Sequence, residues 1–262
     1  MFLLNNPGDT SPFDVYLESN RAGRTLAHVP RLPGCVVRGE IPQEAAAAVA
    51  EAIQQHLAWL AAHSGCDFSR KVRIRVAGGV PGGAATGTGS RGGLLPTDLI
   101  PVEADELAEH LRRIDYSRRD LLEVIARIPP ELLAARPGPK QWTIRETLQH
   151  VAAAEQFYLS RLFKLARFQP QPTPLDRLRI VRDAAYRLLA QCNLRRANRT
   201  VRKFGEPWTL RKVLRRFLDH EREHLLSIEW RLHLADLPFA PGWMTRGARN
   251  RELRLAEAFR FR

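Results

Sequence analysis

The sequence predicts an α+β domain followed by an all-α domain. In the first 76 residues, short segments alternate apolar and polar residues between turn residues, which is typical of strands. Residues 77–93 are rich in glycine and have no hydrophobic period, which indicates a linker. Beyond them, apolar residues recur at helical spacing. The predicted parts are an α+β domain, a linker, a helical domain and a tail, at 1–76, 77–100, 101–236 and 237–262.

The α+β domain is predicted to have the order β-β-β-α-β. Residues 13–18 and 24–29 alternate as two strands, with turn residues between them. A turn and a short third strand are expected over 33–39. A helix is expected over 42–62, because a proline suits its first position. Alternation over 71–76 predicts the last strand.

The helical domain is predicted to contain four amphipathic helices. Pro129 and Pro130 end the first, and Thr143 opens the second with Glu146 three residues later, as in a capping box. The expected helices occupy 102–128, 143–168, 176–196 and 209–234. Four such helices with breakers between them favour a four-helix bundle. In the tail, which carries Trp243, a last short helix is expected over 250–259.

The composition indicates neither a membrane protein nor a secreted one. The 262 residues include no run of 18 or more apolar residues, so no membrane span is expected. The first residues lack a basic start and a long apolar stretch, so no secretory signal is expected. Cys35, Cys66 and Cys192 are far apart and form no CxxC motif, which predicts reduced thiols in a cytoplasmic protein.

The net charge of +13 is concentrated in the second half of the chain. Residues 177–216 contain 13 lysine and arginine residues against two acidic ones, Asp183 and Glu206. Such a segment could bind phosphates or nucleic acid. The same residues would also suit solvated helix faces, and no base-reading motif accompanies them. The solvated face is therefore the preferred interpretation.

Two helix starts resemble each other at an offset of 66 residues. Trp142-Thr143 and Trp208-Thr209 each precede a helix with apolar periodicity. The simplest account is a pair of equivalent helix starts in a pseudo-symmetric bundle, whose end the two tryptophans would fill. The equivalence also puts His150 and the histidines of the fourth helix within about two to four turns of corresponding starts.

Three histidines are the candidate metal ligands. His220 and His224 are four residues apart and so share one face of a helix, and His150 is expected at a similar depth on a facing helix. Neutral imidazoles suit divalent zinc, nickel, iron or copper, and three protein ligands leave positions for water or substrate. The alternative is that each is a hydrogen-bonded core residue. The other five histidines have no comparable partners, which favours the metal site.

The segment His220-Glu221-Arg222-Glu223-His224 also fits the HExxH motif of zinc proteases. In that interpretation Glu221 would be the general base on a metal-bound water. The protease fold needs a sheet edge beside the helix and a third ligand downstream. The only later histidine is His233, and Trp230 occupies the position of the third metzincin histidine. Because helices surround the motif, the protease interpretation is set aside.

The residues Trp142-Thr143-Ile144-Arg145-Glu146, Leu148 and His150, together with His220 and His224, resemble the DinB-like superfamily over about 101–236. The resemblance implies a four-helix bundle in which the three histidines hold one divalent metal ion. Zinc and nickel are the first choices, and iron, manganese and copper are alternatives. Some members resemble thiol-dependent transferases and isomerases that use a low-molecular-weight thiol such as bacillithiol or mycothiol, whose pKa the metal would lower. Action on DNA is not implied.

The N-terminal domain resembles the HicB-like antitoxin fold. The matching residues are 15–18, 27–35 and 44–45, and the resemblance covers about 11–76. In antitoxins this unit blocks a small ribonuclease toxin, often with a separate DNA-binding tail. Here helices follow in place of such a tail. The resemblance therefore implies an interaction or dimerisation module, and a homodimer is one expected state.

Three functions remain open on the sequence. The first is a divalent-metal-dependent enzyme, either a thiol-dependent S-transferase or a hydrolase, acting on a small molecule. Glu221 and Glu223 would then be candidates for a catalytic or orienting group, and Asp219 is another. The second is a non-catalytic interaction or regulatory protein of toxin–antitoxin-like origin, which the metal only stabilises. The third is nucleic-acid binding through residues 177–216, which a steep salt dependence would reveal.

Overall fold

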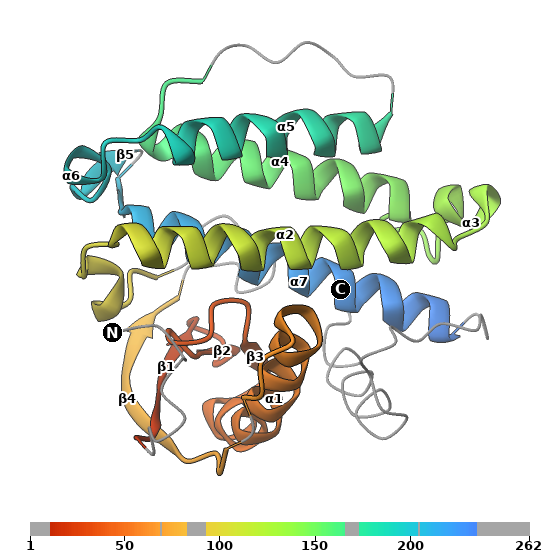
Figure 1. The fold of residues 1–262 in the computed structure, drawn as a ribbon. Coiled ribbons are helices and arrows are strands. Elements are labelled where there is room, and N and C mark those ends of the chain that lie inside the picture. The colour runs from red at the N-terminus through yellow and green to blue at the C-terminus, as the bar shows by residue number, and fades with distance from the viewer. Residues whose placement is uncertain (1–10, 69, 83–92, 166–172, 204, 235–262) are drawn as a thin grey trace. The chain divides into compact units, whose positions relative to one another are not determined.

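The computed structural model describes residues 11–68, 70–82, 93–165, 173–203 and 205–234 (Figure 1). The described residues form two compact units. The sheet unit contains those up to Thr97 together with the end of the last helix from Leu225, and the helical unit contains Asp98–His224. The predicted succession of an α+β part and a helical part is confirmed. Among the described residues, no helix is both long and apolar enough to cross a membrane.

The sheet unit has the predicted order β-β-β-α-β. Its elements are β1 (Phe13–Ser19), β2 (Thr25–His28), β3 (Val36–Gly39), α1 (Pro42–Ser64) and β4 (Ile74–Pro81). The strands are arranged as β3-β2-β1-β4, with β1 antiparallel to β2 and parallel to β4. The helix α1 packs on the sheet, and its buried Val49, Ile53 and Trp59 form a core with Phe13 and Val15 of β1. This core buries apolar side chains that alternate along the first strand.

The last strand differs from the prediction. It begins at Ile74 instead of residue 71 and runs to Pro81, so it includes the start of the predicted linker. Gly78 and Gly79 pair with β1, and the register between the two strands shifts just before them, between Val15 and Tyr16. Glycine inside a strand often accompanies such an irregularity. The prediction placed these glycines in a linker because it rested on composition alone. Residues 83–92 of the predicted linker lie outside the described ranges.

Four long helices, α2, α4, α5 and α7, make up most of the helical unit (Figure 1). Its elements are η1 (Pro96–Leu99), α2 (Ala104–Ala126), α3 (Pro130–Ala134), α4 (Ile144–Leu162), α5 (Pro174–Ala190), α6 (Leu194–Ala197), β5 (Val201–Lys203), β6 (Glu206–Trp208) and α7 (Leu210–Leu234). The second and third helices end earlier than predicted, and the β5–β6 hairpin was not predicted. Strands of three residues are too short to show alternation. The expected tail helix and Trp243 lie outside the described residues.

One hydrophobic cluster joins the four long helices. Buried members from each helix include Ile114, Leu159, Leu189 and Phe217. Trp208, directly before α7, is 1% exposed and belongs to this cluster, as predicted. Trp142 is 40% exposed, so the prediction that both tryptophans fill the end of the bundle is wrong for this one. The two helix starts are therefore equivalent in sequence but not in packing.

The caps of α4 and α7 follow the sequence signal. The Thr143 hydroxyl accepts a hydrogen bond from the Glu146 backbone N–H at 3.0 Å, and the Glu146 carboxylate accepts one from the Thr143 N–H at 2.7 Å. This capping box confirms the predicted helix start. The Thr209 hydroxyl accepts from the Lys212 N–H at 3.2 Å and donates to the Asp98 carbonyl at 2.7 Å. Both threonines thus fix where a long helix begins.

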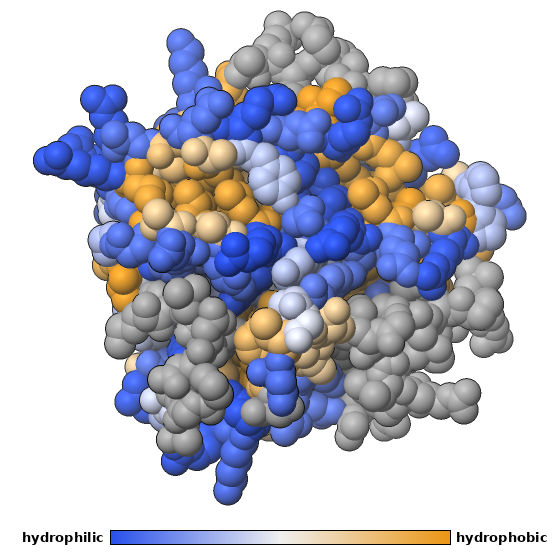
Figure 2. Space-filling view, viewed as in Figure 1, coloured by the Kyte–Doolittle hydropathy of each residue, from blue (hydrophilic) through white to orange (hydrophobic). Residues whose placement is uncertain are grey.

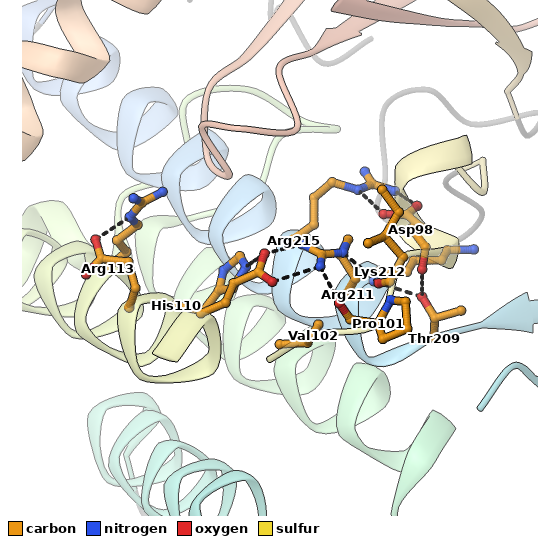
Figure 3. Close-up of polar contacts among 12 residues, drawn as sticks. Asp98, Pro101, Val102, His110, Arg113, Thr209, Arg211, Lys212 and Arg215 are labelled. Carbon is orange, nitrogen blue, oxygen red and sulfur yellow. Dashed lines mark hydrogen bonds and ion pairs between the residues drawn. The ribbon is translucent and has the colours of Figure 1, made fainter. Parts of the chain in front are cut away.

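Charged side chains lie at buried positions along the first half of α7 (Figure 3). Arg211 pairs with Glu106 of α2. Arg215 pairs with Asp98 of η1 at 2.7 Å and with Asp219 at 3.3 Å. An unpaired buried charge costs several kcal/mol, about 3–5 when one partner of a buried pair is removed. Each arginine therefore requires its carboxylate partner. Together these pairs fix how α7 lies against η1 and α2.

His110 of α2 is a buried, uncharged group in the same region (Figure 3). Burial, and after it the charges of Arg113 and Arg211, lowers the pKa of His110 to about 3. The unfolded chain takes up a proton on this imidazole below about pH 6.5, whereas the folded protein does not until about pH 3. The unfolded state therefore binds more protons between these values, and stability falls as the pH falls through them.

We predict that His110→Gln makes the protein less sensitive to acid. Between pH 7 and pH 5 the wild-type protein should lose about 2 kcal/mol more unfolding free energy than the variant, since one pKa unit corresponds to about 1.4 kcal/mol. Urea unfolding at both pH values measures this difference, and every other titrating group contributes equally to the two proteins. Equal pH dependence in both would contradict the assignment of His110 as a buried neutral imidazole.

Candidate metal centre

The structure brings the three predicted histidines together. His150 lies in the second turn of α4, and His220 and His224 lie one turn apart on α7. One ligand nitrogen from each ring lies within 4.8 Å of the others. The Nε2 atom of His220 is 3.0 Å from that of His150 and 3.2 Å from that of His224. His150 and His220 are 70 residues apart in sequence, yet α4 and α7 bring the three imidazoles to one position.

The chemistry of this donor set fits a metal ion. In a neutral imidazole each ring nitrogen either donates or accepts, so one nitrogen that faces two others cannot satisfy both by hydrogen bonding. A cation instead accepts a lone pair from all three. Two ligands at about 2.1 Å from one ion lie about 3.0–3.4 Å apart for angles between about 90° and the tetrahedral value. The observed 3.0 and 3.2 Å separations match this spacing.

Burial keeps the imidazoles of His150 and His220 uncharged. It lowers the pKa of His220 well below its usual range, and His224, Arg216 and His150 lower it further by charge repulsion. Burial also lowers the pKa of His150. Metal ligation requires the neutral imidazole. At neutral pH the folded protein therefore offers both rings in the protonation state that binds metal.

Two aromatic side chains flank the histidines, and neither was predicted as part of the site. The ring of Trp142, immediately before the α4 cap, lies 4.6 Å from that of His150. The ring of Tyr158 on α4 lies 5.9 Å from that of His220. The Tyr158 hydroxyl accepts a hydrogen bond from Arg216 at 3.1 Å. The sequence predicts only a packing role for Trp142. Its spacing of eight residues from His150, about two helical turns, is the sequence feature that could have placed it beside this ligand.

Glu221 points into a buried ion cluster. Its carboxylate accepts hydrogen bonds from Arg118 of α2 at 2.8 Å and from Arg182 of α5 at 3.0 Å. Glu155 of α4 accepts from the same two arginines, at 2.7 and 2.6 Å. Burial alone would raise the pKa of Glu221, but Arg118 and Arg182 outweigh it and lower the pKa. This carboxylate is held ionised by two guanidinium groups, which is a poor arrangement for a general base.

The other two acidic candidates also lie on α7. Asp219 is buried and pairs with Arg215 one turn earlier in the helix. Glu223 is partly exposed. The three carboxylates at 219, 221 and 223 therefore have different surroundings although they alternate along one short segment. Helical phase separates Glu221 from Asp219 and Glu223, which are four residues apart and share one face of α7.

The basic segment 177–216 is not a continuous surface. Five of its 13 basic side chains are buried, namely Arg182, Arg211, Lys212, Arg215 and Arg216. Six arginines of the segment are exposed, at 179, 187, 195, 196, 199 and 202. On the face shown in Figure 2, hydrophobic patches interrupt the hydrophilic surface, and exposed apolar residues of this unit include Leu122 and Leu175. Arg182, Arg211 and Arg215 neutralise buried carboxylates, so these three do not contribute to a basic surface.

Residues 113–228 match the family model of the DinB superfamily. Over this range the helical part is similar to the DinB superfamily. The matched range includes His150, His220 and His224 as well as the four residues of the buried ion cluster. The residues of the sheet unit up to Thr97 lie outside this match. No curated protein and no solved structure matches the chain.

We predict that Arg182→Met destabilises the helical unit strongly. Removing this guanidinium leaves Glu155 and Glu221 with one arginine between them in a buried site, which costs about 3–5 kcal/mol of unfolding free energy. Urea unfolding measures the loss. Arg179→Met, on the same helix, is the matched control, because its ion pair with Asp183 is exposed and 4.0 Å long. Similar effects of the two substitutions would show that the buried cluster contributes no more than a surface pair.

Proposed function

We propose that the four long helices form a DinB-like four-helix bundle that holds one divalent metal ion between His150, His220 and His224. The observation that carries this proposal is the convergence of the three Nε2 atoms. Imidazole ligands favour zinc or nickel, and iron, manganese and copper are alternatives. The match to the DinB superfamily over residues 113–228 supports the same assignment.

We further propose that the protein is a metal-dependent enzyme acting on a small molecule, as a thiol-dependent S-transferase or a hydrolase. Three protein ligands leave coordination positions for water or a thiol. A bound metal ion would lower the pKa of either group and supply a nucleophile. The protein residues then orient the metal ligands. Because Glu221 is held by two arginines, proton transfer by this carboxylate is not part of the proposal.

The alternative is a metal-stabilised interaction protein of toxin–antitoxin-like origin. The β-β-β-α-β order of the sheet unit favours it, since this is the order expected for the proposed HicB-like domain. In this case the metal would only stabilise the bundle, and the sheet unit would bind a partner or a second copy. The two functions differ in whether the metal accepts an external ligand.

We predict that the purified protein contains about one equivalent of divalent metal per chain, and that His220→Ala loses it. His220 is the central ligand, because its Nε2 lies near both other nitrogens. Elemental analysis after dialysis measures the stoichiometry. His63→Ala on α1 is the control, since this histidine belongs to the sheet unit. Absence of metal in the wild-type protein after reconstitution, or retention in His220→Ala, would contradict the site.

We predict that the cobalt-substituted protein binds a low-molecular-weight thiol at the metal. A thiolate entering an open position should add a sulfur-to-metal charge-transfer band and change the visible spectrum of the cobalt ion. Titration with a thiol, followed by absorption, measures this, and an alcohol of the same size is the control. A spectrum that thiols leave unchanged would favour the closed, stabilising metal of the alternative function.

A further inference from the structure

Four charged side chains meet in the interior of the helical unit, one from each long helix. Arg118 of α2 and Arg182 of α5 lie between Glu155 of α4 and Glu221 of α7. Arg118 is 2.7 Å from Glu155 and 2.6 Å from Glu221, and Arg182 is 2.6 and 3.0 Å from them. All four residues are buried. The cluster has two positive and two negative groups, so its charge is balanced without solvent.

The two arginines are also fixed to the backbone of each other's helix. Arg118 on α2 donates to the Leu178 carbonyl of α5 at 2.9 Å, and Arg182 on α5 donates to the Ile114 carbonyl of α2 at 2.8 Å. A guanidinium group is planar and presents its donors in a rigid fork. With backbone and carboxylate partners on both sides, neither group can shift without breaking several hydrogen bonds. The arginines therefore form a fixed platform on α2 and α5.

The carboxylates that dock on this platform come from the two helices that carry the candidate metal ligands. Glu221 directly follows His220 on α7, and Glu155 lies five residues after His150 on α4. A shift of either helix that changed the separation of His150 and His220 would also pull its glutamate away from the arginines. No metal ligand comes from α2 or α5. Helices α2 and α5 therefore influence the candidate metal site through these arginine–glutamate contacts.

From this arrangement we propose that the cluster of Arg118, Glu155, Arg182 and Glu221 positions the metal ligands. The proposal rests on the proposed metal site. The four are positioning residues, because they fix the approach of α4 to α7 and so hold the three Nε2 atoms at metal-binding spacing before the ion arrives. Glu221, the glutamate of the HExxH segment, thus serves the metal site by fixing the position of its helix and not by proton transfer.

The same helix supplies a matched control. Arg211 of α7 pairs with Glu106 of α2, also in the interior, more than two turns before His220. This pair joins α7 to α2 and has no member on α4. Its loss should destabilise the protein without changing how His150 faces His220. A cluster that merely stabilised the fold would behave in the same way as this pair.

The test compares Glu155→Gln and Glu221→Gln with Glu106→Gln. Each substitution keeps the shape of the side chain and removes its charge. For the wild-type protein and each variant, zinc affinity is measured by competition with a chelator, and the cobalt complex is examined by visible absorption. Circular dichroism establishes a temperature at which every protein is folded. Arg182→Lys, which keeps the charge and loses the fork, replaces any glutamine variant of the cluster that does not fold.

We expect Glu155→Gln and Glu221→Gln to weaken zinc binding about 10- to 100-fold and to alter the cobalt spectrum, with Glu106→Gln close to the wild-type protein in both measurements. Arg182→Lys should weaken zinc binding in the same direction. Unchanged zinc affinity and spectra in the cluster variants would overturn the positioning role and leave the metal site intact. An equal loss in Glu106→Gln would also overturn it, because any interior pair would then suffice. A wild-type protein without metal would instead reject the proposed function itself.

Discussion

The helical unit depends on the neutralisation of charge along α7. The first half of this helix is buried although it carries arginines, a lysine and acidic residues, and burial of an unpaired charge is costly enough to prevent folding. Arg211 pairs with Glu106, Arg215 pairs with Asp98, and Glu221 pairs with two arginines. Apolar packing brings the helices together but is compatible with several relative positions of the helices. These ion pairs form only when the helices have one particular relative position. Replacing them with apolar residues could leave stability unchanged, so their contribution is to the choice of arrangement.

The same constraint changes the meaning of the HExxH segment. In a zinc protease its glutamate must face the metal with a free carboxylate. Here Arg118 and Arg182 both donate hydrogen bonds to the Oε2 atom of Glu221, so this oxygen is bound to guanidinium groups and is not free. The motif specifies only that two histidines share a face. What the intervening glutamate does is decided by the side chains of other helices, which the motif does not contain.

The sequence predicts this site better than its surroundings. The spacing of His220 and His224, and the equivalent helix starts at Thr143 and Thr209, depend on local rules of helix periodicity and capping, and the structure has both starts. The ion cluster could not be foreseen, because its members are 27 to 103 residues apart in sequence and arginine is abundant in this chain. The β5–β6 hairpin was too short for a pattern, and the glycines of β4 imitated a linker. Contacts between distant segments decide each of these features.

A site built from two helices has a particular vulnerability. His220 and His224 keep their spacing as long as α7 is helical, but His150 reaches them only through the packing of α4 against α7. One hydrogen bond between neutral imidazoles contributes only about 1 kcal/mol, so without a metal ion the histidines contribute little to holding the helices together. Any metal affinity that requires all three ligands is therefore linked to whatever fixes this one distance. Apolar packing tolerates small slides, whereas the forked hydrogen bonds of the buried arginines do not, and they meet the backbone of α2 and α5 as well as the glutamates of α4 and α7. These forked hydrogen bonds thus act on the two helices whose approach sets the ligand spacing.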